Sequence, residues 1–207
     1  MRRYLAIDIG ASSGRHIVGW REGGELKTEE VFRFPNGPIR RGGALVWDIE
    51  ALLGNVKAGV AAAREKYPDL VSLSVDTWGV DYVLMAGDEP IGPAYAYRDA
   101  RSLAVVDEVH ARVPFEELYA RTGIQFQSFN TLYQLCADLS AGRLGRATGF
   151  LMLPEYLMFR LCGARAHEYT NATTTGLVSA ATGEYDLELI SRLGLPERLF
   201  GPLSAPG

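Results

Sequence analysis

The order of the first elements is decided by residues 4–34, YLAIDIGASSGRHIVGWREGGELKTEEVFRF, where three apolar runs are separated by glycine-containing turns. The residue types favour strands at 4–9, 16–21 and 25–34, because β-branched and aromatic side chains pack well on a pleated surface. A glycine pair between the second and third runs supplies a tight turn. The stretch therefore predicts three successive antiparallel strands.

The residues that follow are expected to extend this sheet and to cover it. A short strand is predicted at 44–47, and Asp48 is a good N-cap because its carboxylate can accept from free amides of a first helical turn. Apolar residues then recur at helical spacing from 49 to 67, and the apolar run 70–75 predicts a returning strand. We expect an α/β core with a mixed sheet and an acidic residue at the ends of two strands.

The second half of the chain is predicted to be largely helical. A hairpin is expected first, pairing 82–85 with 94–97 across a glycine-bounded turn. Helical spacing and capping residues then indicate three helices, at 103–113, at 132–139 with Asn130 as the cap, and at 154–161 closed by Gly163. No repeat or low-complexity linker divides residues 1–207, so we expect one α/β lobe with an added helical portion.

Composition excludes several classes of protein. With 47% hydrophobic and 22% charged residues the chain can form a core, and a net charge of −4 disfavours nucleic acid as a partner. No apolar run reaches the length of a membrane span and no signal peptide is evident, so the expected location is cytoplasmic and no membrane partner is expected. Cys136 and Cys162 are isolated and expected to be small buried side chains, without a disulfide or zinc site.

The strongest local signal for chemistry is residues 8–15, DIGASSGR. A carboxylate at a strand end, a glycine-bounded turn with two hydroxyls and then a cation together supply the groups that hold a polyphosphate and its Mg²⁺. A hairpin turn with solvated serines is the structural alternative. The spacing also fits the Gly-x-Ser-x-Gly motif of serine hydrolases, but that motif needs a helix after the serine, whereas strand residues follow. A Walker-type phosphate loop is absent.

The second signal is residues 74–82, SVDTWGVDY. Gly79 would let a ligand approach the main chain while the Trp78 indole packs on its apolar face, which is typical of a polyol site flanked by acids such as Asp81. Two alternatives remain open. Trp78 could be an ordinary core aromatic, and the strand-end acids Asp8 and Asp76 could hold two metal ions in a ribonuclease-H-like nuclease, although the acidic composition disfavours that.

Several of these segments together resemble the FGGY carbohydrate kinases, and the resemblance covers essentially the whole chain. The matching segments are 8–15, 76–81, 96–101, 123–126, 129–135, 153–163 and 169–175. It implies a ribonuclease-H-like lobe of the actin and hexokinase type, with ATP and Mg²⁺ on one side of a cleft and a sugar on the other. It also implies transfer of the ATP γ-phosphoryl group to the C1 hydroxyl of L-rhamnulose, in rhamnose catabolism.

The resemblance assigns the site residues one by one. ATP phosphates would be held by Ala11, Ser12, Ser13, Gly14 and Arg15, and Mg²⁺ by Asp8. The sugar side would include Gly79, together with the polar or aromatic candidates Trp78, Asp81, Arg98, Gln125 and Asn130, several of which are also ordinary caps or loop residues. Phosphoryl transfer mainly requires positioning and charge neutralisation, which these residue types can supply.

One element of the family pattern has no counterpart in this chain. The catalytic aspartate of the family, which takes the proton from the sugar hydroxyl, lies in a C-terminal lobe, and no residue after 169 matches it. We therefore expect this chain to be an N-terminal lobe, partnered by that C-terminal lobe and inactive alone. A kinase for xylulose, fuculose, ribulose or a polyol is an alternative, as is a non-catalytic sugar- or nucleotide-binding module.

Overall fold

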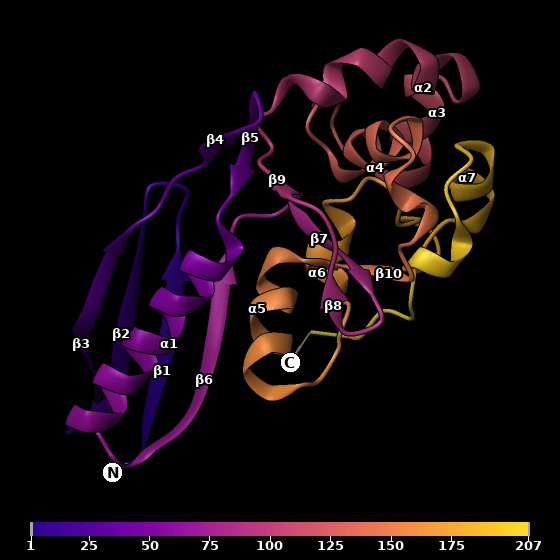
Figure 1. Cartoon of the computed structure of the whole chain (residues 1–207). Helices are drawn as coiled ribbons and strands as arrows, with labels where there is room; N and C mark the ends of the chain where they lie inside the picture. Colours follow the sequence, from indigo (N-terminus) through magenta and orange to yellow (C-terminus); the bar gives the residue numbers. More distant parts are fainter. Residues whose placement is uncertain (1, 207) are drawn as a thin grey trace.

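A four-stranded mixed sheet forms one side of the molecule in the computed structural model, which describes residues 2–206 (Figure 1). The strand order is β3-β2-β1-β6, with bounds β1 Arg3–Ile9, β2 Ser13–Glu22, β3 Glu25–Pro35 and β6 Leu70–Thr77. β1 pairs antiparallel with β2 and parallel with β6, and β2 pairs antiparallel with β3. The predicted antiparallel opening and returning strand are confirmed.

Helix α1 (Ile49–Lys66) covers one face of this sheet. The predicted cap is present, since the Asp48 carboxylate accepts from the amide of Ala51 at 3.1 Å. The covered face is apolar and buried, with contributions from the sheet and from α1 that include Leu5, Ile7, Ile9, Val18, Leu52, Leu53 and Val56. On the opposite face of β1, Tyr4 and Ala6 are exposed.

Helix α1 packs tightly against the sheet at Gly59. A Cβ at this position would lie 2.3 Å from the imidazole of His16, so only glycine fits without a shift of the ring. The His16 ring is fully buried, and its Nε2 lies 3.1 Å from the Val56 carbonyl oxygen. Burial lowers the pKa of His16, which favours a neutral ring that donates to this carbonyl.

Two small sheets connect the four-stranded sheet to the helical portion. β7 (Tyr82–Ala86) lies between β10 (Gly149–Met152) and β8 (Glu89–Pro90), and β5 (Ala44–Trp47) lies between β4 (Ile39–Arg41) and β9 (Ala94–Tyr95).

The predicted hairpin between 82–85 and 94–97 is wrong. Gly87, at a positive φ of 58°, makes a two-residue turn that places β8 opposite β7 instead. After Pro90 the Ile91 amide still donates to the Leu84 carbonyl oxygen at 2.8 Å, and the chain then moves on so that β9 pairs with β5.

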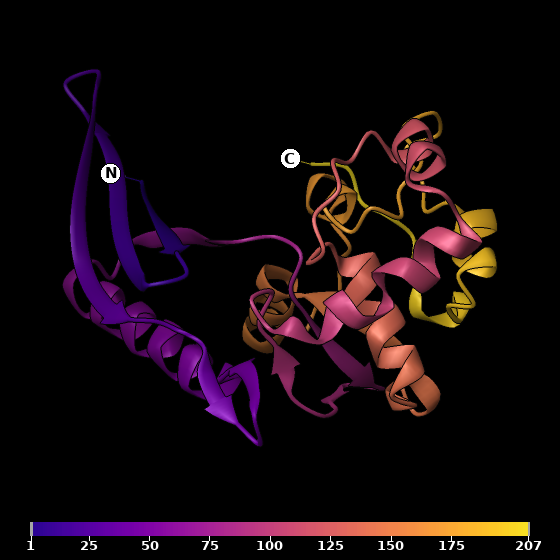
Figure 2. The ribbon, with the colours of Figure 1, turned by 90° about the horizontal axis from the view of Figure 1, so that it is seen from above.

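The helical portion contains more and shorter helices than expected (Figure 2). The predicted helix at 103–113 is a 3₁₀ turn followed by a short α-helix, and Asn130 precedes α4 without capping it, since its Oδ1 accepts from the Gln127 amide at 2.9 Å. The helices are η1 Ala100–Val105, α2 Val106–Arg112, α3 Phe115–Thr122, α4 Thr131–Ser140, η2 Arg143–Gly145, α5 Leu153–Cys162, α6 Tyr169–Thr173, α7 Leu187–Arg192 and η3 Glu197–Leu199.

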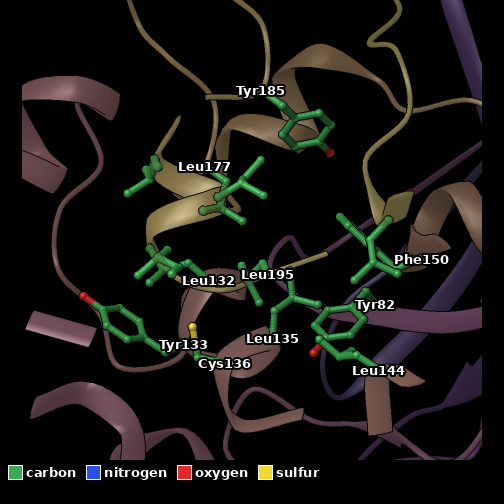
Figure 3. Packing of buried hydrophobic residues seen from close by; sticks show 14 of the residues in the cluster. Tyr82, Leu132, Tyr133, Leu135, Cys136, Leu144, Phe150, Leu177, Tyr185 and Leu195 are labelled. Carbon is green, nitrogen blue, oxygen red and sulfur yellow. The ribbon is translucent and has the colours of Figure 1, made fainter. Parts of the chain in front are cut away.

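Two hydrophobic clusters form the core. One lies within the helical portion and includes Tyr82, Leu135, Phe150, Leu177 and Leu195 (Figure 3). The other joins the four-stranded sheet and α1 to β7, β10 and α5. The predicted burial of the cysteines holds for Cys136 but not for Cys162, which is exposed at the last residue of α5, before Gly163 turns the chain away. Within residues 2–206 no helix is both long and apolar enough for a membrane span.

Candidate functional site

The turn between β1 and β2 is fixed by main-chain and amide hydrogen bonds. The Gly10 amide donates to the Ser13 carbonyl oxygen at 2.8 Å, and Asn36 donates twice, from its main chain to Ser12 at 3.0 Å and from its side chain to Gly10 at 2.8 Å. Asn36 was not among the sequence candidates. Its position in a Pro-Asn-Gly-Pro segment predicts a turn after β3. Only the sheet register shows that this residue reaches the turn between β1 and β2.

Beside this turn a row of charges crosses the exposed face of the sheet. Asp8 lies opposite Arg15 on β2 and opposite Asp76 on β6 in the strand register. The Arg15 Nε donates to the Asp8 carboxylate at 2.7 Å, and both side chains are nearly half exposed. Next to the turn at 10–12 the face therefore presents the carboxylates of Asp8 and Asp76 beside the cation of Arg15, with the exposed Arg33 opposite Arg15 on β3. This combination suits an anion together with a hydrated cation.

The acids fit a magnesium ion that is held mainly by water and phosphate oxygens. Residues 2–206 contain no group of three or more His, Cys, Asp or Glu side chains placed to hold a metal ion. Three such side chains are not required, because Mg²⁺ in phosphate sites usually binds only one or two carboxylates and keeps several waters. Asp8 and Asp76 can supply that number.

The loop between β6 and β7 contains an unusual backbone conformation. Among the described residues Val80 is the only non-glycine with a positive φ, at 68°. Such a conformation costs about 1–3 kcal/mol and persists only where neighbours hold it. The Val80 amide donates to Thr174 Oγ1 at 3.2 Å, while its carbonyl oxygen accepts from Thr131 Oγ1 at 2.8 Å and from Gln134 Nε2 at 3.2 Å.

Asp81 fixes the neighbouring aromatic residues from a buried position. Its side chain is 1% exposed and accepts from the indoles of Trp47 (2.6 Å) and Trp78 (2.9 Å), from the Tyr97 amide (3.1 Å) and from Gln134 Nε2 (3.1 Å). Burial raises the pKa of Asp81, and the four donors oppose that rise by stabilising the carboxylate. Asp81 therefore fixes the Trp78 indole by a buried hydrogen bond and does not present a free carboxylate to solvent.

The Trp78 ring also packs against the ring of Trp47. Its ring centroid lies 4.2 Å from that of Trp47. Trp47 and Gln134 were missed as sequence candidates, because nothing in the local pattern around 47 or 134 shows that both reach the same carboxylate. The sequence signal that could have found Trp47 is a large aromatic at a strand end, which is also a common core feature.

A cavity of about 570 Å³ lies next to Gly79. Asp76, Thr77 and Gly79 line one side of it. The other side comes from α5, α6 and the loop between them, including Glu155, Met158, Glu168, Asn171 and Thr174. A pocket with an apolar floor and a few convergent polar groups is the usual form of a small-molecule site.

Glu155 joins the two helices that line this cavity. Its carboxylate accepts from the amides of Met152 at 3.1 Å and Glu168 at 3.0 Å, so it ties the start of α5 to the residue that caps α6. Burial raises the pKa of Glu155 to about 7, although these amides favour the charged form. Glu155 was also missed, because a glutamate three residues into a helix is usually only a local capping group.

The remaining sequence candidates lie in different surroundings. Arg98 is exposed and its Nε donates to the Tyr97 hydroxyl at 3.0 Å, which places it beside the Asp81 group. Asn130 is buried and closes its own loop. Gln125 is exposed on that loop, and no contact described for residues 2–206 ties it to Gly79.

Comparisons with known proteins show the family of this chain. The family model described as the N-terminal domain of the FGGY family of carbohydrate kinases matches residues 3–206. Similar curated proteins include the rhamnulokinase of Oceanobacillus iheyensis, 43% identical over 98% of this chain and 44% of its own length. The rhamnulokinase of Halalkalibacterium halodurans is 44% identical over 100% of this chain and 44% of its own length. The chain thus spans less than half the length of these relatives.

The fold also matches solved structures. The ligand-bound xylulose kinase of Lactobacillus acidophilus superposes with a TM-score of 0.86 at 17% identity, over 100% of this chain and 42% of that one. At that identity the likeness shows the fold alone. It confirms the expected fold class, a mixed α/β lobe of the sugar-kinase type.

Proposed function

Because this chain belongs to the FGGY family of carbohydrate kinases, we propose that it is the N-terminal lobe of an enzyme that transfers the ATP γ-phosphoryl group to the C1 hydroxyl of L-rhamnulose. The observation that carries the substrate is the 43% identity over nearly the whole chain to a curated rhamnulokinase. The remaining length of such relatives would supply a C-terminal lobe that closes the cleft.

On the nucleotide side, residues 11–15, which comprise the end of the turn and the first residues of β2, would hold the ATP phosphates. The main chain of the turn is already ordered by Asn36, so binding would cost little conformational freedom. Arg15 would lie beside the phosphates and offset their charge, and Asp8 would orient the waters of a bound Mg²⁺. The metal, when bound, supplies charge neutralisation on the transferred group.

On the sugar side, Gly79 and Trp78 would contact the ketose, with Arg98, Gln125 and Asn130 as further polar candidates. Asp81 is assigned to holding the Trp78 indole, because its lone pairs are already used by four protein donors. The cavity beside Gly79 would accept the part of the sugar that points away from ATP.

Catalysis would also require a base, which we assign to the C-terminal lobe of the longer protein. No residue of this chain is proposed to take the proton from the sugar hydroxyl. We therefore expect residues 1–207 alone to release no ADP above background in the presence of ATP, Mg²⁺ and L-rhamnulose.

The direct test is a coupled ADP-release assay on the full gene product that contains this chain. We expect the highest kcat/KM with L-rhamnulose in a panel that also holds L-fuculose, D-xylulose and L-ribulose. These sugars differ by one methyl group or one hydroxyl configuration, and a methyl contact discriminates between substrates by only about 1–3 kcal/mol. The sugars should therefore be compared by their ratios of kcat/KM. Preference for xylulose would overturn the substrate, and ligand binding without any turnover would indicate a binding module.

A further inference from the structure

Residue 80 is a junction of three segments that are far apart in the sequence. Its amide is bound by Thr174, which follows α6, and its carbonyl oxygen by Thr131, the first residue of α4. The two segments are themselves connected, since the Leu132 amide donates to the Thr175 carbonyl oxygen at 3.0 Å. The left-handed backbone of Val80 is therefore held on both sides by one connected structure.

The hydroxyl of Thr174 has a defined direction. It donates to the Asn171 carbonyl oxygen at 2.8 Å, so its lone pairs remain to accept the Val80 amide. The Thr174 side chain also lies 3.1 Å from the position that a Cβ on Gly79 would occupy. Thr174 thus packs against the glycine and fixes the next amide, on the side where Gly79 lines the cavity.

We propose that Thr174 and Thr131 form a clamp on Val80 that sets the direction of the Gly79 main chain toward the sugar, and that Thr174 is a positioning residue for sugar binding. The inference rests on the proposed function for its substrate. It explains why a β-branched residue adopts φ 68° where glycine would be expected, because a flexible residue would let the sugar-facing main chain rotate. Trp78, fixed by Asp81, anchors the other end of the same short segment.

The variant that isolates the clamp is Thr174→Val, which keeps the shape of the side chain and removes the hydroxyl. In the full gene product we expect the KM for the sugar to rise at least about tenfold while the KM for ATP changes less than about twofold. Thr174→Ser should restore most of the sugar affinity. Thr173→Val is the matched control, since the Thr173 hydroxyl donates only to the Thr170 carbonyl oxygen within the same helix.

A second measurement separates failure of the clamp from failure of the proposed function. Amide hydrogen exchange of residues 78–82 requires no turnover, and we expect Thr174→Val to speed exchange at Val80 while Thr173→Val does not. If the wild type phosphorylates no sugar, the proposed function fails but faster exchange still supports the clamp. Unchanged exchange in Thr174→Val overturns the clamp, as does faster exchange with an unchanged sugar KM in an active enzyme.

Discussion

At the scale of single residues, Asp81 holds several distant parts of the chain together. Two indoles, a main-chain amide and a side-chain amide donate to one buried carboxylate, and they come from β5, the loop before β7, the segment after β9 and α4. The sequence indicated the importance of this acid but not its role. Its neighbours in space are distant in sequence, and the pattern Trp-Gly-Val-Asp fits a ligand contact and a buried support equally well.

Asp81→Asn should destabilise the protein and loosen Trp78. An asparagine has one acceptor oxygen, so its NH₂ group would face at least one of the present donors, and a buried unsatisfied donor costs about 1–3 kcal/mol. Urea unfolding followed by tryptophan fluorescence measures this loss. Asp107→Asn, an exposed position in α2, should stay within about 0.5 kcal/mol of wild type. An equal, small effect at both positions would argue against the role of Asp81.

Asp8→Asn should affect catalysis and leave sugar binding intact. The substitution keeps the size of the side chain but removes the charge that pairs with Arg15 and that would orient a hydrated Mg²⁺. In the full gene product we expect kcat to fall on the order of 10²-fold, as for the loss of other preorganised electrostatic groups. Calorimetry should give an unchanged Kd for the sugar. Wild-type turnover in this variant would remove Asp8 from the site.

Glu155 should make stability depend on pH in a defined direction. Its pKa is raised to about 7 in the folded chain, so between roughly pH 4.5 and 7 the folded state binds more protons than the unfolded state. Its contribution is therefore present at acid pH and is lost as the pH rises through 7, by on the order of 3 kcal/mol at most.

The measurement is urea unfolding of wild type and Glu155→Gln at about pH 5 and pH 8. Wild type should lose more stability than the variant on going to pH 8. The comparison between the two proteins removes the contribution of His16, whose pKa is lowered by burial and which acts in the opposite direction. The contribution of His167 does not cancel, because its Nδ1 lies 3.8 Å from the Glu155 carboxylate. The same pH dependence in both proteins would contradict the assignment.

At the scale of elements, local patterns predicted those parts whose partners are near in sequence. The first three strands, the cap of α1 and the return of β6 follow from residue type, turn glycines and helical spacing. The predicted hairpin partner of β7 was wrong because two short strands, β8 and β9, follow it in succession. β8 pairs with β7 and β9 pairs with β5, and strand propensity alone does not distinguish these pairings. The short helices after residue 100 were merged or missed because each is stabilised by tertiary packing.

The two glycines of α1 should respond to alanine in opposite ways. Gly59→Ala would place a methyl group 2.3 Å from the buried His16 ring, and overpacking of this kind typically costs 1–3 kcal/mol. Gly54→Ala meets no atom within 4 Å and should stabilise the exposed helix by about 0.5–1 kcal/mol. Thermal or urea unfolding of both variants checks the prediction. A stabilising Gly59→Ala would mean that the helix does not approach the sheet as described.

At the scale of the whole molecule, the candidate site lies where the four-stranded sheet meets the helical portion (Figure 1). The turn at 10–12 and the loop at 78–80 follow the parallel neighbours β1 and β6, and strands that run in the same direction end at the same edge. That part of the site could be predicted from the sequence. The contributions of α5, α6 and the start of α4 could not, because only the packed core brings residues 131 and 174 to the loop and places Glu155 on the same cavity.

The most direct test of the proposed site is a crystal structure of the full gene product with ADP, Mg²⁺ and L-rhamnulose. We predict the nucleotide phosphates on the main chain of residues 11–15, with Asp8 on the magnesium side. The sugar should contact Gly79 and Trp78, with Val80 still at a positive φ. Phosphates bound at any other part of residues 2–206, or a sugar bound away from Gly79, would contradict the proposed site.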